Sequence, residues 1–165
     1  MTIIGVLSDT HLASPTEQFR QYCAQALADC EIIIHAGDLT DLAILSAFGD
    51  KEVVAVCGNM CSLASQQQLN ERRLVSVEGY SIGVTHGAGP RHNIVDRVYG
   101  LFPEADAIVY GHTHQAARER IGKTLLLNPG SFQGTGRHGA AGTYALITID
   151  ERGLQASLHS LRPLP

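Results

Sequence analysis

The sequence predicts an α/β fold in which mixed β-sheets carry helices on their outer faces. Short apolar runs rich in β-branched residues recur along the chain, and helical patterns separate the early ones. Residues 32–34 and 53–56 are continuously apolar, as expected of strands covered on both faces. The alternation of strands and helices gives way to a second half with strands and few helices. We therefore expect a βαβαβ unit that leads into an antiparallel-rich half.

Nine strands are expected, each a short apolar segment bounded by turn residues: 2–7, 31–34, 53–57, 73–77, 80–85, 107–110, 124–127, 143–149 and 155–161. The clearest helix includes residues 19–30, whose apolar positions follow the i, i+3, i+4, i+7 pattern. Ser14, Pro15 and Glu17 predict its N-cap, first turn and capping box. Shorter helices are expected at 41–48 and 93–102.

Length and composition limit the possible classes of protein. With 165 residues, 44% of them hydrophobic and 17% charged, the chain is expected to fold as a single domain, residues 1–165. Twelve basic and 16 acidic residues give a formal net charge of −4. A mildly acidic chain is a poor candidate for a dedicated nucleic-acid binder.

The same features suggest a location in the cytoplasm. No apolar run approaches the ~20 residues of a membrane span, and residues 1–8 lack the basic start of a signal peptide. We therefore expect no membrane association. The four cysteines, in a chain large enough to build a core, do not imply disulfides. We expect a cytoplasmic protein, with a homo-oligomer as an open possibility.

Polar residues of the kinds that bind metals follow five of the expected strands. Each strand end is succeeded by an Asp, His or Asn, usually beside a glycine: Asp9 and His11, Asp38, Asn59, His86, and His112 and His114. In an open α/β sheet the carboxyl ends of parallel strands share one edge, where ligands bind. Seven such side chains are too many for one metal ion and suit a two-metal centre, an arrangement used for displacement at phosphorus.

Each of these segments also has an ordinary structural explanation. The Asp-x-His tripeptide is often a plain turn, the Gly-Asp pair often a helix entry, and Gly-Asn a turn dipeptide. His86 can be a buried core histidine, and residues 111–114 can form a surface loop. The occurrence of all five, in order and each at a strand end, favours the metal site.

The set of motifs resembles the signature of the calcineurin-like metallophosphoesterase superfamily. That signature reads Asp-x-His, Gly-Asp-x-x-Asp, Gly-Asn, a strand-end His and Gly-His-x-His, present here over residues 9–11, 37–41, 58–59, 86 and 111–114. The short chain and the segment 128–131 (Asn-Pro-Gly-Ser) more narrowly resemble the small YfcE-like phosphodiesterases. The resemblance, over about residues 3–149, implies a four-layer αββα sandwich of two mixed sheets with flanking helices.

The resemblance also implies a ligand set and an activity. Asp9, His11, Asp38 and His114 would hold one metal ion, and Asp38 would bridge to a second, completed by Asn59, His86 and His112. Of these, Asp38, Asn59 and His86 are expected to be catalytic. The implied enzyme is a metal-dependent phosphodiesterase that uses a metal-bridging hydroxide on small phosphodiesters. Manganese is the favoured metal ion, while Ni²⁺, Fe²⁺ and Zn²⁺ also suit oxygen and nitrogen ligands.

The sequence departs from the family pattern at two places. Many relatives have His after Gly-Asn, as an acid for the leaving group, and small relatives commonly have Asp one position later; here these are Met60 and Cys61. Esters with good leaving groups should therefore react best. Ala88 stands where many relatives have a second His. Arg91 or His92 can take the role of that His, but both are more simply explained as solvated residues at the start of the next helix.

Several other residues that could carry chemistry are more simply explained as structural or exposed residues. His35, in an apolar run, is expected to be a buried structural histidine, and His159 an ordinary strand residue. Cys57 and Cys61 are expected to pack as small apolar side chains rather than to recruit a soft metal. Arg137 and His138, in a glycine-rich loop, can clamp a phosphate but are more simply exposed.

Two alternative functions remain on the same fold. One is a non-catalytic scaffold, as in the retromer-complex member, whose metal site is degenerate; here none of the seven expected ligands is lost. The other is a phosphomonoesterase or nuclease of the same superfamily. A nuclease would need a basic groove, which the net charge does not support. Composition and motifs identify no natural substrate.

Overall fold

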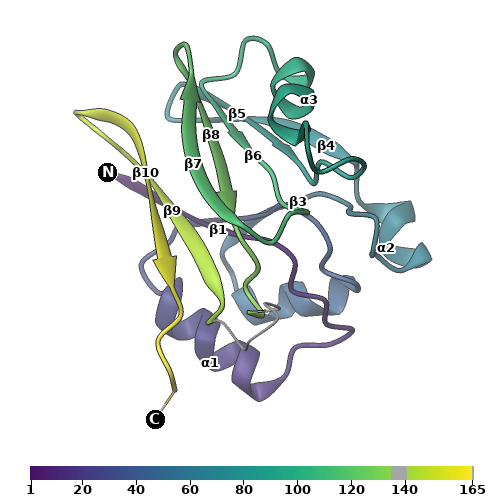
Figure 1. Ribbon diagram of the computed structural model, residues 1–165. Helices are drawn as coiled ribbons and strands as arrows, with labels where there is room; N and C mark the ends of the chain where they lie inside the picture. Colours follow the sequence, from purple (N-terminus) through teal and green to yellow (C-terminus); the bar gives the residue numbers. More distant parts are fainter. Residues whose placement is uncertain (135–140, 165) are drawn as a thin grey trace.

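The computed structural model describes residues 1–134 and 141–164, which form two five-stranded sheets with helices outside them (Figure 1). The first sheet has the order β10-β9-β1-β2-β3, and the second has the order β4-β5-β6-β8-β7. The strands of the first sheet are β1 (Thr2–Leu7), β2 (Ile32–His35), β3 (Glu52–Ala55), β9 (Thr143–Asp150) and β10 (Gly153–Ser160). The second sheet is made of β4 (Arg72–Val77), β5 (Tyr80–Thr85), β6 (Ala107–Val109), β7 (Ala116–Ile121) and β8 (Thr124–Pro129).

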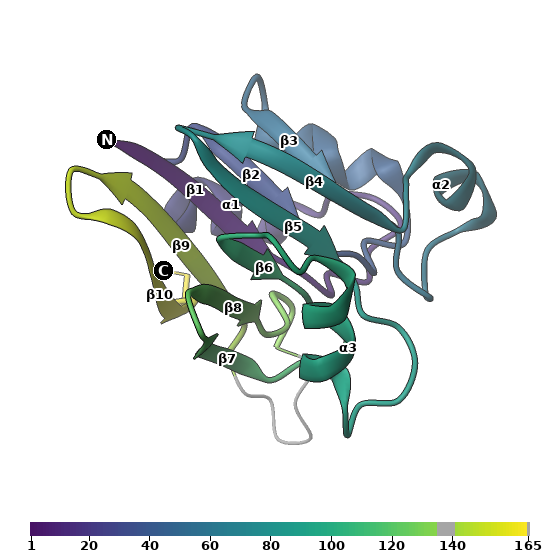
Figure 2. The same cartoon turned by 90° about the horizontal axis from the view of Figure 1, so that it is seen from above.

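Both sheets are mixed, and the chain forms the expected αββα sandwich. In the first sheet β1, β2 and β3 run parallel and β9 and β10 antiparallel to their neighbours. In the second, β5, β6 and β8 run parallel, whereas β4 and β7 pair antiparallel at the two edges. Figure 2 shows the two sheets stacked face to face. The parallel centre of the second sheet differs from the antiparallel-rich half that we expected.

Alternation along the strands divides the core into three parts. Ile34 packs between the two sheets, whereas its neighbour Ile33 faces the helix α1 (Glu17–Ala26). In β6, Val109 lies between the sheets and Ile108 faces the helix α3 (Ile94–Leu101). Because successive side chains of a strand point to opposite faces, a strand between two layers must be apolar on both. This explains the uninterrupted apolar runs in the sequence.

Four helical segments flank the sheets: α1 (Glu17–Ala26), the 3₁₀ helix η1 (Leu42–Phe48), α2 (Leu63–Gln68) and α3 (Ile94–Leu101). The Thr16 hydroxyl caps α1 by accepting from the Phe19 N–H, so the N-cap is Thr16 and not Ser14. The predicted stripe extends beyond α1, since Leu27 and Cys30 are buried after the helix has ended.

Two elements were missed by the sequence analysis. Strand β7 carries charged residues on an exposed sheet edge, and α2 is a single short helix capped by the Ser62 hydroxyl. All four cysteines are free thiols, as expected. In the described part of the chain, no helix has the length and apolar character needed to cross a membrane.

Candidate metal centre

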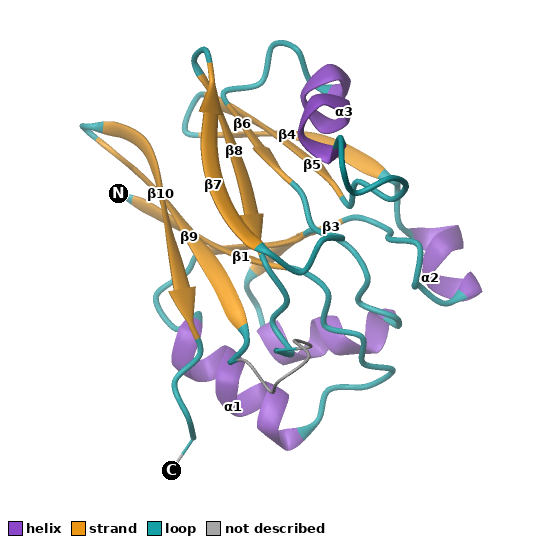
Figure 3. Ribbon diagram, in the orientation of Figure 1, coloured by secondary structure: helices purple, strands orange, loops and turns teal. Residues whose placement is uncertain are grey.

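The seven predicted ligands lie in loops that follow parallel strands of both sheets (Figure 3). Asp9 and His11 follow β1, Asp38 follows β2, Asn59 follows β3, His86 follows β5, and His112 and His114 follow β6. Backbone hydrogen bonds link neighbouring loops: the N–H of Asp9 donates to the carbonyl of Gly37, and that of Gly111 donates to the carbonyl of His86. The carboxyl ends of the parallel strands therefore meet as the sequence predicts.

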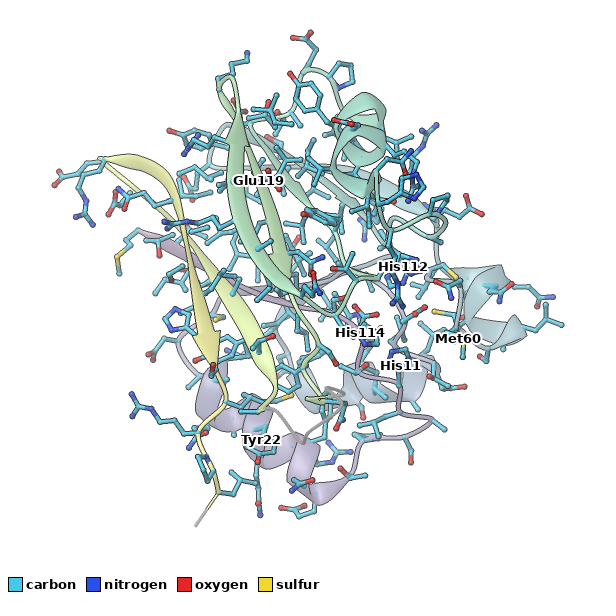
Figure 4. The ribbon with its side chains drawn as sticks, viewed as in Figure 1. His11, Tyr22, Met60, His112, His114 and Glu119 are labelled. Carbon is cyan, nitrogen blue, oxygen red and sulfur yellow. The ribbon has the colours of Figure 1, made fainter. Side chains whose placement is uncertain are left out.

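One group of side chains joins the end of β1 to the end of β6. His114 Nε2 lies 3.0 Å and His11 Nε2 3.7 Å from Asp9 Oδ1. The two imidazole Nε2 atoms are 3.3 Å apart. Figure 4 shows His11 and His114 next to each other, below His112. Asp9, His11 and His114 thus present three ligand atoms close enough to share one cation.

A second group joins the ends of β1, β2 and β5. His86 Nε2 lies 3.1 Å from Asp38 Oδ2 and 3.9 Å from Asp9 Oδ1. These three side chains are almost fully buried. The second group shares Asp9 with the first, whereas the sequence analysis expects Asp38 as the bridging carboxylate.

Buried atoms without partners test whether a cation fits here. Among the described residues, Asp9 Oδ1 and His86 Nε2 are the only buried side-chain nitrogen or oxygen atoms that make no hydrogen bond. An unsatisfied buried polar atom costs about 1–3 kcal/mol, so folded proteins rarely keep two of them together. Both atoms lie in the second group, where a bound cation would satisfy them. The donor set of carboxylates and imidazoles fits a first-row divalent cation.

Hydrogen bonds on the far side fix which atoms of the aspartates face the centre. Asp9 Oδ2 accepts from the His112 N–H at 3.1 Å and from the Ser8 hydroxyl, which leaves Oδ1 toward the histidines. Asp38 Oδ1 accepts from the Met60 N–H at 2.7 Å, which leaves Oδ2 toward His86. Each carboxylate therefore uses one oxygen for the protein and presents the other to the site. Sequence reasoning missed Ser8 and the Met60 N–H, because neither has a side chain typical of metal sites.

Backbone carbonyls fix the tautomers of two histidines. His86 Nδ1 lies 2.8 Å from the Ala36 carbonyl, and His112 Nε2 lies 2.9 Å from the Gly89 carbonyl. Because a carbonyl only accepts, each of these nitrogens carries a proton. In the neutral imidazoles the lone pairs therefore belong to His86 Nε2 and His112 Nδ1. This is the outer hydrogen bonding that orients histidine ligands in metalloproteins.

The last two predicted ligands lie outside the two groups. The His112 ring packs edge-on against the His86 ring, with 5.2 Å between centroids. Asn59 is exposed and, together with His86, lines a cavity beside the centre. The structure thus brings five of the seven residues into two groups that share Asp9, and places Asn59 and His112 at the margin next to His86.

The loops are built from backbone conformations that most residues avoid. Seven described non-glycine residues have φ between 49° and 71°, and five of them are predicted ligands: Asp9, His11, Asp38, His112 and His114. Left-handed conformations of this kind cluster at functional sites, where the surroundings hold them in place. A Cβ on Gly58 would overlap Asp38, and one on Gly111 would overlap Ser8, so the motif glycines allow the close approach of these loops.

The electrostatics of the second group favour an ionised Asp38 carboxylate beside a charged His86 ring. Burial disfavours the ionised form of Asp38, but the His86 ring and the Met60 N–H outweigh burial and lower its pKa. Burial also opposes the charged form of His86, yet the two aspartates raise its pKa. A cation at this site would replace the proton on His86 Nε2.

Comparison with known proteins is consistent with this geometry. A family model for the calcineurin-like phosphoesterase superfamily domain matches residues 1–152. The chain belongs to the calcineurin-like phosphoesterase superfamily.

Two curated archaeal proteins are among the relatives of this superfamily member. It is 36% identical to a probable metallophosphoesterase of Methanothermobacter thermautotrophicus over 132 residues, 78% of this chain and 76% of the relative. It is 27% identical to a phosphodiesterase of Methanocaldococcus jannaschii over 151 residues, 79% of this chain and 84% of the relative.

Solved structures show the same fold. A structure described as a novel archaeal phosphodiesterase is similar with a TM-score of 0.75 and 22% identity, covering 97% of this chain and 100% of that one. Wild-type Vps29 of Entamoeba histolytica, solved in complex with zinc, is similar with a TM-score of 0.71 and 19% identity, covering 96% and 99%. At these identities the two likenesses concern the fold.

The departures from the superfamily pattern have visible consequences. Met60 is 58% exposed and offers no titratable group, while its backbone N–H holds Asp38. Cys61 is buried, and its sulfur accepts from the Gly58 N–H. Burial, followed by the neighbouring Cys61, raises the pKa of Cys57 to about 12, so this cysteine is a buried thiol, as expected. Arg91 and His92 are exposed beside the start of α3.

The remaining polar residues have structural roles. His35 is fully buried and bonded to the Thr10 hydroxyl and the Gly37 N–H, as expected. The Asp41 carboxylate caps η1 through the Ala43 N–H. His159 stacks on Tyr144 in the first sheet. Arg137 and His138 lie outside the described residues.

The segment 128–131, which the resemblance singled out, supports the loops of the centre. Asn128 Nδ2 donates to the Gly111 carbonyl and to the Thr113 hydroxyl. The Ser131 hydroxyl donates to the Asp9 carbonyl at 3.0 Å. These bonds hold the backbone on both sides of the first group.

Proposed function

We propose that this protein is a cytoplasmic phosphodiesterase that depends on two divalent cations. The observation that carries the proposal is the convergence of Asp9, Asp38 and His86 with two buried atoms that lack hydrogen bonds. The phosphodiesterase named among the relatives supports the reaction class. The four unpaired cysteines support a reducing compartment.

In this proposal His11 and His114 hold one cation, His86, His112 and Asn59 hold the other, and carboxylates join the two. Asp38 is the expected shared ligand, and Asp9, which belongs to both groups, would be a second one. Manganese is the favoured metal ion, with Ni²⁺, Fe²⁺ and Zn²⁺ compatible with the same ligands. Bound cations would supply Lewis acidity, which polarises a phosphoryl oxygen and makes water a nucleophile near neutral pH.

The residues of the chain itself orient the ligands and limit the substrates. The Met60 N–H and the His112 N–H hold the two carboxylates in the orientation that presents one oxygen of each to the site. Met60 has no ionisable proton, and the Cys61 thiol is buried, with its sulfur accepting from the Gly58 N–H, so we expect aryl esters to react faster than alkyl esters.

The experiment compares hydrolysis of bis-p-nitrophenyl phosphate and p-nitrophenyl phosphate with Mn²⁺ and with a chelator. We expect Mn²⁺-dependent hydrolysis with preference for the diester. Asp38→Asn should remove nearly all activity because it weakens both cation sites. Asp41→Asn is the matched control from the same motif, since asparagine also caps a helix. Activity that survives in Asp38→Asn, or is unaffected by the chelator, contradicts the mechanism, and preference for the monoester contradicts the diester assignment.

The fold likeness to Vps29 suggests a scaffold as the second candidate function. Because that Vps29 structure is complexed with zinc, metal binding alone does not separate the two functions, and turnover does. A protein that binds Mn²⁺ with the expected ligands but hydrolyses neither ester would support the scaffold.

A further inference from the structure

A cavity of about 530 Å³ opens beside the second group, on the side of Asn59 and His86. Its other walls come from α2 and the segment that follows it, with Gln66, Leu69 and Glu71, and from α3, with Leu101. Figures 1 and 2 show α2 and α3 on the same side of the molecule. The volume lies within the usual range of ligand pockets, about 300–1,000 Å³.

The cavity offers little to a second anionic group. Arg97 is its one lining lysine or arginine, and the guanidinium bonds to the carbonyls of Gly87, Ala88 and Pro90 and to Asn93 Oδ1. Four of its five N–H donors are therefore used by the protein. An arginine committed in this way cannot form the two-pronged contact with a phosphate or carboxylate that anion sites use.

Two side chains of the cavity present free acceptor atoms. Within residues 1–134 and 141–164 the carboxylate of Glu71, an exposed residue, makes no hydrogen bond or ion pair; only its backbone carbonyl is used, by the Thr85 hydroxyl. The Gln66 side chain donates through Nε2 to the Cys61 carbonyl at 2.9 Å, which leaves Oε1 as an acceptor. Leu69 and the 40%-exposed Leu101 supply apolar surface beside them.

We propose that this cavity binds the ester arm of the substrate that stays on the phosphate, and that this arm is an organic group with N–H or O–H donors and no negative charge. The inference rests on the proposed function, because the phosphoryl group must lie at the adjoining metal centre. Glu71 is its specificity-determining residue. Donors on the arm pair with Glu71 and Gln66, whereas an anionic arm meets the Glu71 carboxylate without a free cationic partner.

The test uses three p-nitrophenyl diesters with the same leaving group, whose second arm is ethyl, 2-aminoethyl or 2-carboxyethyl. With Mn²⁺ present, kcat/KM for the aminoethyl ester should exceed that for the ethyl ester by up to about 5-fold, the usual limit for an exposed ion pair, and the carboxyethyl ester should be the poorest. Glu71→Gln should reduce the aminoethyl-to-ethyl ratio to below about 2-fold, since glutamine keeps the size and loses the charge. Glu104→Gln, an exposed glutamate outside the cavity, is the control and should keep the ratio.

The outcomes separate this inference from the proposed function. An aminoethyl ester no better than the ethyl ester, or a ratio unchanged in Glu71→Gln, overturns the subsite while Mn²⁺-dependent hydrolysis still supports the phosphodiesterase. Hydrolysis of none of the three esters overturns the phosphodiesterase and the subsite together. Equal Mn²⁺ content in the three proteins excludes a loss of the metal centre as the cause.

Discussion

His35 and His86 have different roles because their ring nitrogens have different hydrogen-bond partners. His35 is bonded at both nitrogens, to the Thr10 hydroxyl and the Gly37 N–H, whereas His86 is bonded at Nδ1 alone. Both lie at strand ends, and the apolar run before His35 predicted a structural role for it, whereas His86 was predicted as a ligand. The partners themselves, the Thr10 hydroxyl for His35 and the Ala36 carbonyl for His86, come from other strand ends, and no local pattern in the sequence specifies them.

The full burial of His35 makes stability depend on pH. Burial, followed by the charge of His86, lowers the pKa of His35 to about 3. The unfolded chain therefore binds a proton near pH 6.5 that the folded chain refuses, and stability falls as the pH drops below that value. Between pH 7 and pH 5 this single group should remove about 2 kcal/mol from the free energy of unfolding.

Urea unfolding of the metal-free protein at pH 7 and pH 5 measures this loss. His35→Asn keeps an acceptor for the Gly37 N–H but does not titrate, so its free energy of unfolding should fall by about 2 kcal/mol less over this range. Equal losses in the two proteins would show that His35 does not carry the effect.

Among the helices and strands, the sequence predicted those whose apolar pattern is set by burial and missed those that lie mostly at the surface. Strand β2 and helix α3 were predicted because they face cores. Strand β7 was missed because an exposed edge strand needs no apolar alternation: its segment Arg118–Glu119–Arg120 is charged. The start of α1 was misplaced because Ser14 and Thr16 are both good caps, and only the backbone decides between them.

Hydrogen bonds of one arginine link α3 to the metal centre. Arg97 of α3 bonds the carbonyls of Gly87, Ala88 and Pro90, and the remaining residue of this loop, Gly89, accepts from His112 Nε2. Arg97 is therefore a positioning residue for the loop that orients His112. Ala88, where relatives have a histidine, contributes only its carbonyl to this arrangement.

Arg97→Met should weaken Mn²⁺ binding by about 10–100-fold, the usual cost of losing an outer partner of a metal ligand. Calorimetric titration of the metal-free protein with Mn²⁺ measures it without reference to activity. Arg97→Lys should recover part of the affinity, and Arg20→Met, whose guanidinium bonds only Ser46 among the described residues, should leave it unchanged. Wild-type affinity in Arg97→Met would show that the loop holds its shape without the arginine.

At the scale of the whole molecule, the centre draws its ligands from both sheets. Asp9 and Asp38 follow strands of the first sheet, whereas His86 and His114 follow strands of the second. The strand pattern predicted that the strand ends meet, because parallel strands share an edge, whereas the two sheets were implied only by the family resemblance. Sheet membership depends on pairing between distant segments, such as β1 with β9, which local periodicity does not encode.

A cation held by residues from the strand ends of both sheets should therefore stabilise the entire fold. A ligand that binds only the folded state adds about 2.7 kcal/mol at 100 times its dissociation constant, or about 5–10 °C in Tm for a chain of this size. Thermal unfolding of the metal-free protein with and without saturating Mn²⁺ measures the shift. Asp9→Asn should abolish most of it, because Asp9 belongs to both groups, and Asp41→Asn should retain it. A full shift in Asp9→Asn would mean that Mn²⁺ binds elsewhere, and an unchanged Tm of the wild type would remove the physical basis for a metal centre at these strand ends.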